Sequence, residues 1–192
     1  LRALGDDADS GRVHALVARA EGNPLFLEEL LRAEADREDD GPAALPITAL
    51  AAVQRRFDAL DLDARRVLRA ASVFGRTFTR VGVERLLEPI SAATVTRALA
   101  LLRAEGVVLP QSGARARAAE EYAFRHSLAR DAAYASIAEA DLWTLHERAA
   151  GYAVESQRVG AAAVAEHYER AGRSDAAASW WARAAEESAH AQ

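Results

Sequence analysis

Two adjacent residues carry side chains that could bind a phosphate group. Arg125 and His126 lie in "FRHS", between a predicted strand and a predicted helix. An imidazole N–H just before a helix N-terminus can donate to a phosphate oxygen, and a guanidinium can bind phosphate through two parallel hydrogen bonds. A single histidine at such a position is, however, more often a capping or packing residue. Both interpretations of His126 stay open at this point.

The stretch "EGNP" is a corner inside an amphipathic helical pattern. Gly22 is typical of a helix C-terminus, Asn23 of a helix cap and Pro24 of the first position of the next helix. Taken alone, this is ordinary turn chemistry, and it favours a structural role for Pro24.

The sequence contains no recognisable catalytic motif. Lysine is absent and no GxxxxGK[ST] occurs, so the chain is not a self-sufficient P-loop ATPase. HExxH and GxSxG motifs are also missing. Cysteine is absent, which excludes disulfides and thiolate metal sites and agrees with a cytoplasmic protein. We therefore expect no catalytic residues, no metal site and no enzymatic activity in this chain.

The composition predicts a mainly α fold. Of the 192 residues 51% are hydrophobic, and alanine, leucine, arginine and glutamate dominate. The net charge of −5 gives no overall attraction to nucleic acid or to an anionic membrane. The N-terminus lacks a signal-peptide core, and no apolar run is long enough to cross a bilayer. Methionine is absent even at position 1, so we expect the natural protein to begin upstream.

The turn, cap and linker residues along the chain predict three domains. Residues 1–40 read as two helices joined at the Gly-Asn-Pro corner, and they end in the charged stretch "EADREDDGP". Within residues 41–136, the segments 63–74, 81–87 and 92–105 have helical patterns, with caps at Asp61 or Asp63 and at Ser91. Two short strands at 107–110 and 121–124 then form a hairpin. Three helices followed by a hairpin is the order of a winged helix.

Residues 137–192 read as antiparallel helical hairpins that are similar to tetratricopeptide repeats (TPR-like). Small Ala177 and Ala184 alternate with large Tyr168 and Trp181, as in the packing of such repeats. We expect the tryptophans, among them Trp143, to be packing residues, with one of the adjacent pair at 180–181 pointing away from the core. Because repeats stack in arrays, further repeats are expected downstream.

Four stretches in this order carry a resemblance to a known family: "ARAEGNPLFLEELLR", "LDARRVLRAASVFGRTF", "YAFRHSLARDAAYASI" and "AEHYERAG". They resemble the C-terminal half of the nucleotide-binding core of STAND-class signalling ATPases. The likeness is to bacterial AAA-like modules found beside adenylate cyclase, serine/threonine kinase or LuxR-type DNA-binding domains, and it covers nearly the whole chain. In that family a P-loop domain precedes a helical lid, a winged helix and a superhelical repeat array.

The resemblance implies roles for individual residues. The corner of the lid lies against the adenine in that family, so Pro24 would contact the base. His126 resembles the histidine of a Met-His-Asp motif that reaches the β-phosphate of ADP, although Arg125 and Ser127 replace its neighbours here. Arg125 could approach a phosphate as well. ADP or ATP is expected only together with the upstream P-loop domain.

The interpretation that follows is a non-catalytic regulatory segment of a multidomain signal-transduction ATPase. Its partners would be the upstream P-loop domain and the downstream repeats, with a protein partner or inducer on the repeat region. One alternative is a winged-helix transcription regulator, in which DNA would be held by four arginines: Arg97, Arg103, Arg115 and Arg117. Few base-reading side chains make nucleic acid an improbable partner. The other alternative is a TPR-type scaffold that binds proteins.

Overall fold

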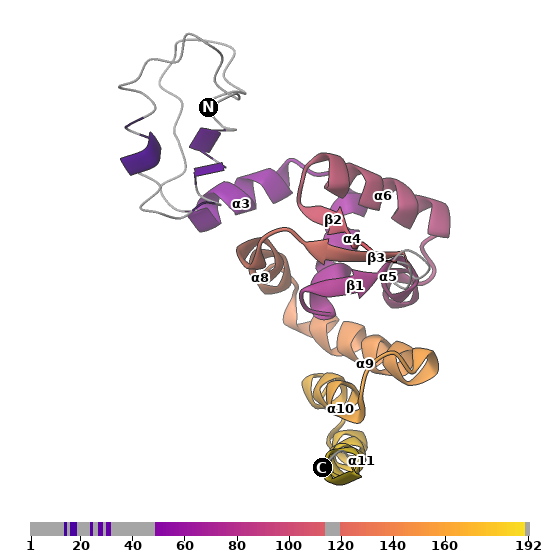
Figure 1. The fold of residues 1–192 in the computed structure, drawn as a ribbon. Helices are drawn as coiled ribbons and strands as arrows, with labels where there is room; N and C mark the ends of the chain where they lie inside the picture. The colour runs from indigo at the N-terminus through magenta and orange to yellow at the C-terminus, as the bar shows by residue number, and fades with distance from the viewer. Residues whose placement is uncertain are drawn as a thin grey trace. The chain divides into compact units, whose positions relative to one another are not determined.

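The computed structural model describes residues 14, 16–18, 24, 27, 28, 30, 31, 49–113 and 120–190. The chain divides into two compact units, residues 1–60 and residues 61–192 (Figure 1). Each unit has buried apolar side chains of its own.

In the first unit, the described residues before position 32 are helical, and Leu16 and Leu30 are buried. Helix α3 (Ala49–Asp58) follows, and it buries Val53 and Phe57, which are four residues apart and therefore on one face. The predicted stop at Gly22, the cap at Asn23 and the charged stretch at 34–42 lie outside the described residues.

The second unit begins with helices α4 (Leu62–Val73), α5 (Arg80–Leu87) and α6 (Ala92–Ala104). Each has an N-cap whose side chain accepts a hydrogen bond from a backbone N–H, namely Asp61, Thr79 and Ser91. The predicted caps at Asp61 and Ser91 are thus confirmed. Helix α6 ends just before Gly106, the predicted stop, whose φ of 65° is the left-handed conformation that glycine adopts without cost.

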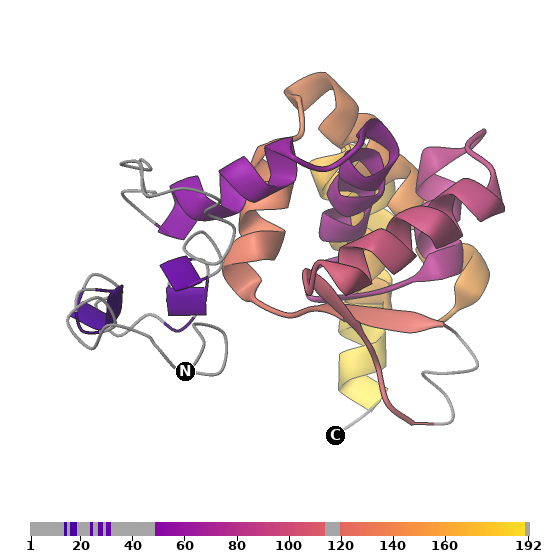
Figure 2. The same cartoon turned by 90° about the horizontal axis from the view of Figure 1, so that it is seen from above.

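A small antiparallel sheet completes this part. It consists of β1 (Thr77–Thr79), β2 (Val108–Pro110) and β3 (Glu121–Phe124) in the order β1-β3-β2. The predicted hairpin of the last two strands is confirmed, whereas β1 was not expected. Helices α4 to α6 lie on one side of the strands (Figure 2). Phe78 on β1 and Phe124 on β3 are buried, and their ring centroids are 5.6 Å apart.

Four helices follow the sheet: α8 (Ser127–Ala135), α9 (Glu139–Ser156), α10 (Ala161–Arg170) and α11 (Ser174–His190). Helix α10 packs against both α9 and α11, and only residues 171–173 separate it from α11 (Figure 1). We call α9 to α11 the repeat helices, and residues 61–126 the sheet part.

The mainly α fold that the sequence predicted is confirmed. In the part of the chain that the structure describes, no helix combines the length and the apolar character that a membrane span needs.

Candidate functional site

Helix α9 presents a face of mostly small residues to its neighbours. His146, Ala149, Ala150 and Ala153 are buried and recur every three or four residues, as one face of a helix requires. Small alanine side chains let the neighbouring helices approach closely. The histidine is therefore the one large polar side chain on the buried face of this helix.

Three polar side chains, Tyr134, His146 and His167, form a cluster that we call the histidine cluster. The Tyr134 hydroxyl and His146 Nε2 are 2.8 Å apart, and His146 Nδ1 and His167 Nδ1 are 2.9 Å apart. A hydrogen bond between two ring nitrogens requires a proton on one and a lone pair on the other. The cluster therefore connects α8, α9 and α10, and at least one of its two imidazoles must be neutral.

The surroundings keep both imidazoles neutral. Burial, assisted by His167, Arg170 and Arg130, lowers the pKa of His146 to about 4. Burial, together with the positive charge of Arg170, likewise lowers the pKa of His167 to about 4. The exposed fraction of His146 is 0%. At neutral pH the cluster therefore carries no charge of its own.

A second set of contacts joins the repeat helices to the sheet part, and we call it the junction: Phe74, Thr79, Gly82 and Tyr152. The Tyr152 hydroxyl shares a hydrogen bond of 2.7 Å with Thr79 Oγ1, which also accepts from the Gly82 N–H. The rings of Phe74 and Tyr152 meet edge to face at 5.9 Å. A Cβ on Gly82 would come within 3.0 Å of both Thr79 Oγ1 and the Tyr152 ring. The junction is therefore closely packed.

Two arginines tie α9 to α5 beside the junction. Arg148 Nη1 donates to the carbonyl oxygens of Leu86, at 2.7 Å, and Glu88, at 3.0 Å, at the end of α5. Arg85 on α5 forms an ion pair with Glu155 on α9. Because these contacts come from both helices, α9 is fixed to the sheet part along much of its length.

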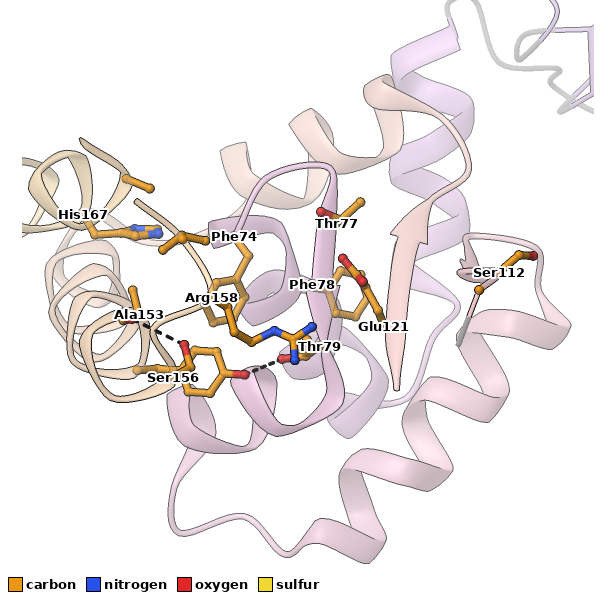
Figure 3. Close-up of a pocket in the computed structure, with 14 residues that line it drawn as sticks. Phe74, Thr77, Phe78, Thr79, Ser112, Glu121, Ala153, Ser156, Arg158 and His167 are labelled. Carbon is orange, nitrogen blue, oxygen red and sulfur yellow. Dashed lines mark hydrogen bonds between the residues drawn. The ribbon is translucent and has the colours of Figure 1, made fainter. Parts of the chain in front are cut away.

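An open cavity of about 630 Å³ lies beside the junction (Figure 3). Its walls come from Phe74 and residues 77–79, from residues 112, 113 and 121, from the C-terminal half of α9 and its following loop, and from Ala163 and His167 on α10. The register of β1 against β3 puts Thr77, Thr79 and Glu121 on the face opposite to Phe78 and Tyr122. Thr79 is hydrogen-bonded to α9, so these three residues project toward the repeat helices.

Two charged side chains of this cavity have no partner among the described residues. Arg158 is exposed and Glu121 is half-buried. Neither side chain makes a hydrogen bond or an ion pair with another described residue, and they do not pair with each other. Among the described residues, these two charges thus differ from those of the arginines that hold α9 to α5, which have partners.

The residues predicted for nucleotide binding lie elsewhere. His126 is the N-cap of α8, as expected from the sequence, and is half-buried, while Arg125 beside it is exposed. The Arg125 N–H donates to the Val107 carbonyl at 3.0 Å, which fixes the backbone at this point. Pro24 is exposed and helical. It belongs to the first unit and His126 to the second, so their convergence on a nucleotide stays a prediction.

Two of the four arginines of the DNA-binding alternative lie in the described part of the chain, and that alternative stays a prediction. Arg97 Nη2 lies 3.1 Å from the Asp63 carboxylate, which partly neutralises it, and Arg103 is exposed. Arg115 and Arg117 lie outside the described residues.

Sequence reasoning missed the histidine cluster and the cavity. His146 and His167 lie 21 residues apart on different helices, and no short motif joins them. The alanines at 149, 150 and 153 were a usable signal, because they place His146 on a small-residue helix face. The packing role expected for Trp143 was wrong, since this side chain is 58% exposed. Trp181 is 41% exposed and Trp180 is half-buried, which agrees with one of the pair pointing outward.

Comparison with known proteins adds no assignment: no protein-family model, curated protein or solved structure matches this chain.

Proposed function

We propose that this chain is a non-catalytic regulatory segment of a signalling ATPase. It would close over a nucleotide held by a P-loop domain and relay the state of that nucleotide to the repeat helices. The proposal rests on the resemblance to STAND-class modules and on one structural observation, the path of contacts from His126 to α10.

That path supports a relay because it is continuous. His126 begins α8, and Tyr134 on the same helix shares a hydrogen bond with His146 on α9. His146 in turn meets His167 on α10. A displacement of α8 by a phosphate on His126 would therefore act on α9 and α10 through a partly buried polar connection. Coupling between two sites needs such an element with two arrangements.

The junction, which attaches α9 to the sheet part, also supports this proposal. Tyr152 and Arg148 attach α9 to Thr79 and to the end of α5, so the sheet part and the repeat helices would move as one body. The exposed Trp143 and Trp181 on α9 and α11 are available to a protein partner or inducer. Their exposure is the specific observation that favours the scaffold alternative, in which the repeats bind a protein without any nucleotide.

The test is a calorimetric titration of ADP into the natural full-length protein and its His126→Ala variant. We expect the wild type to bind and the variant to bind about 10- to 150-fold more weakly, the range for losing a hydrogen bond to a charged group. His190→Ala is the matched control, because His190 is exposed on α11. Equal ADP affinity of wild type and His126→Ala would remove His126 from the nucleotide site. Absence of ADP binding would leave the scaffold alternative.

A further inference from the structure

The cavity beside the junction combines one positive and one negative side chain with an aromatic floor. Figure 3 shows Arg158 and Glu121 reaching into it from different elements, the loop after α9 and strand β3. Phe74 and Tyr152, which are both half-buried, provide apolar surface in the same lining. The lining thus offers opposite charges at two points and an apolar region within one space.

Hydroxyl groups add directional contacts to this lining. They belong to four residues: Thr77, Thr79, Ser112 and Ser156. The Thr79 hydroxyl is already bonded to Tyr152, and that of Ser156 donates to the Ala153 carbonyl at 3.4 Å. Thr77 and Ser112 make no such bond with a described residue. A few polar groups around an apolar floor are typical of small-molecule sites.

We propose that this cavity binds a small zwitterion with an apolar body, of the class of a dipeptide with apolar side chains. The ligand carboxylate would pair with the Arg158 guanidinium, and its ammonium group with the Glu121 carboxylate. Its apolar side chains would cover Phe74 and Tyr152. The volume of about 630 Å³ lies within the usual range of small-molecule sites, about 300–1,000 Å³.

The charge balance of the lining selects this class of ligand. With His167 neutral, Arg158 and Glu121 give the described lining a net charge of zero. A simple anion would be repelled by the Glu121 carboxylate, and a simple cation would be repelled by the Arg158 guanidinium. A zwitterion satisfies both side chains, and a neutral apolar molecule satisfies neither.

The position of the cavity would bring a bound ligand into contact with two parts of the protein. Its walls come from the sheet part and from α9 and α10, so a bound ligand would contact both sides of the junction. This inference goes beyond the proposed nucleotide relay and does not depend on it, because the site lies within residues 61–192 and needs no P-loop domain.

The test is calorimetric titration of the 192-residue chain with the dipeptide L-leucyl-L-phenylalanine. We expect a Kd below about 1 mM. Arg158→Gln and Glu121→Gln should each weaken binding at least about fivefold, because each removes one charged partner. Matched controls are Arg76→Gln and Glu186→Gln, whose side chains are exposed, lie outside the cavity and have no partner among the described residues. Both controls should bind as the wild type does.

Capped forms of the same dipeptide identify which charge meets which residue. The C-terminal amide should bind wild type and Arg158→Gln alike, and the N-acetyl form should bind wild type and Glu121→Gln alike. Equal binding of the doubly capped dipeptide and the zwitterion would overturn the proposal, as would no binding at about 10 mM or no loss in either variant. If a variant failed to fold, the capped dipeptides on the wild type would still decide.

Discussion

The histidine cluster and the cavity both include residues of α9 and α10, but they differ in whether their polar side chains are paired within the protein. In the cluster, Tyr134, His146 and His167 satisfy one another within the protein. In the cavity, Arg158 and Glu121 are left without a partner among the described residues. A closed polar network fixes a core, whereas unpaired groups around an open space are available to a ligand. The first region should therefore control stability, and the second should control binding.

The largest expected effect comes from removing the centre of the cluster. His146→Ala should lower the free energy of unfolding by about 2–4 kcal/mol, because it opens a cavity and leaves the Tyr134 hydroxyl without its partner. Chemical denaturation of the full chain measures this. His190→Ala should change it by less than about 0.5 kcal/mol, since that side chain is exposed. Equal effects would mean that the cluster does not stabilise the core.

The cluster also predicts a pH dependence. The pKa of both histidines is about 4 in the folded state, against about 6.5 in the unfolded chain. Between these values the unfolded state binds more protons, so stability is lost as the pH falls from 6.5 to 4 and levels off below. We expect a loss on the order of 3 kcal/mol for each of the two histidines in denaturation curves recorded across this window. The slope should be shallower in His167→Gln, and an unchanged slope would contradict the assignment.

A pair of glycines tests how closely the junction is packed. Gly82→Ala should lower the free energy of unfolding by about 1–3 kcal/mol, because the new methyl group meets Thr79 and Tyr152 at 3.0 Å. Gly151→Ala on α9 should instead raise it by about 0.5–1 kcal/mol, since nothing lies within 4 Å of the added Cβ and alanine favours the helix. The melting temperatures of the two variants should therefore move in opposite directions.

Removing the Tyr152 hydroxyl from the junction should have a smaller effect on stability. Tyr152→Phe should cost about 0.5–1.5 kcal/mol through the lost hydrogen bond to Thr79. Tyr122→Phe is its control, because Tyr122 stacks on Phe78 and its hydroxyl has no partner among the described residues. If both variants unfolded at the same denaturant concentration, the Thr79 contact would contribute nothing to the attachment of α9.

The smallest expected effect belongs to the cavity. Arg158→Gln should change the free energy of unfolding by less than about 0.5 kcal/mol, because the side chain is exposed and has no partner to lose in the described part of the chain. Denaturation of the variant beside wild type measures this. A clear loss of stability would show that the guanidinium has a structural role.

Features that depend on residues close together in the sequence could be predicted, whereas features that depend on distant residues could not. Ser91 and Gly106 were predictable because a cap or a stop depends on residues within one helical turn. Strand β1 was missed because its three residues are held by pairing with β3, more than forty positions away. His146 and His167 were missed for the same reason, since only the packing of α9 on α10 brings them together.

The central claim is that the state of a nucleotide reaches the repeat helices through His126 and α8. Hydrogen exchange of the natural full-length protein, with and without saturating ADP, tests it most directly. We predict that ADP increases the protection of amides in α9 and α10 of the wild type and leaves them unchanged in His126→Ala. ADP binding without any change in α9 and α10, or with the same change in both proteins, would contradict the relay.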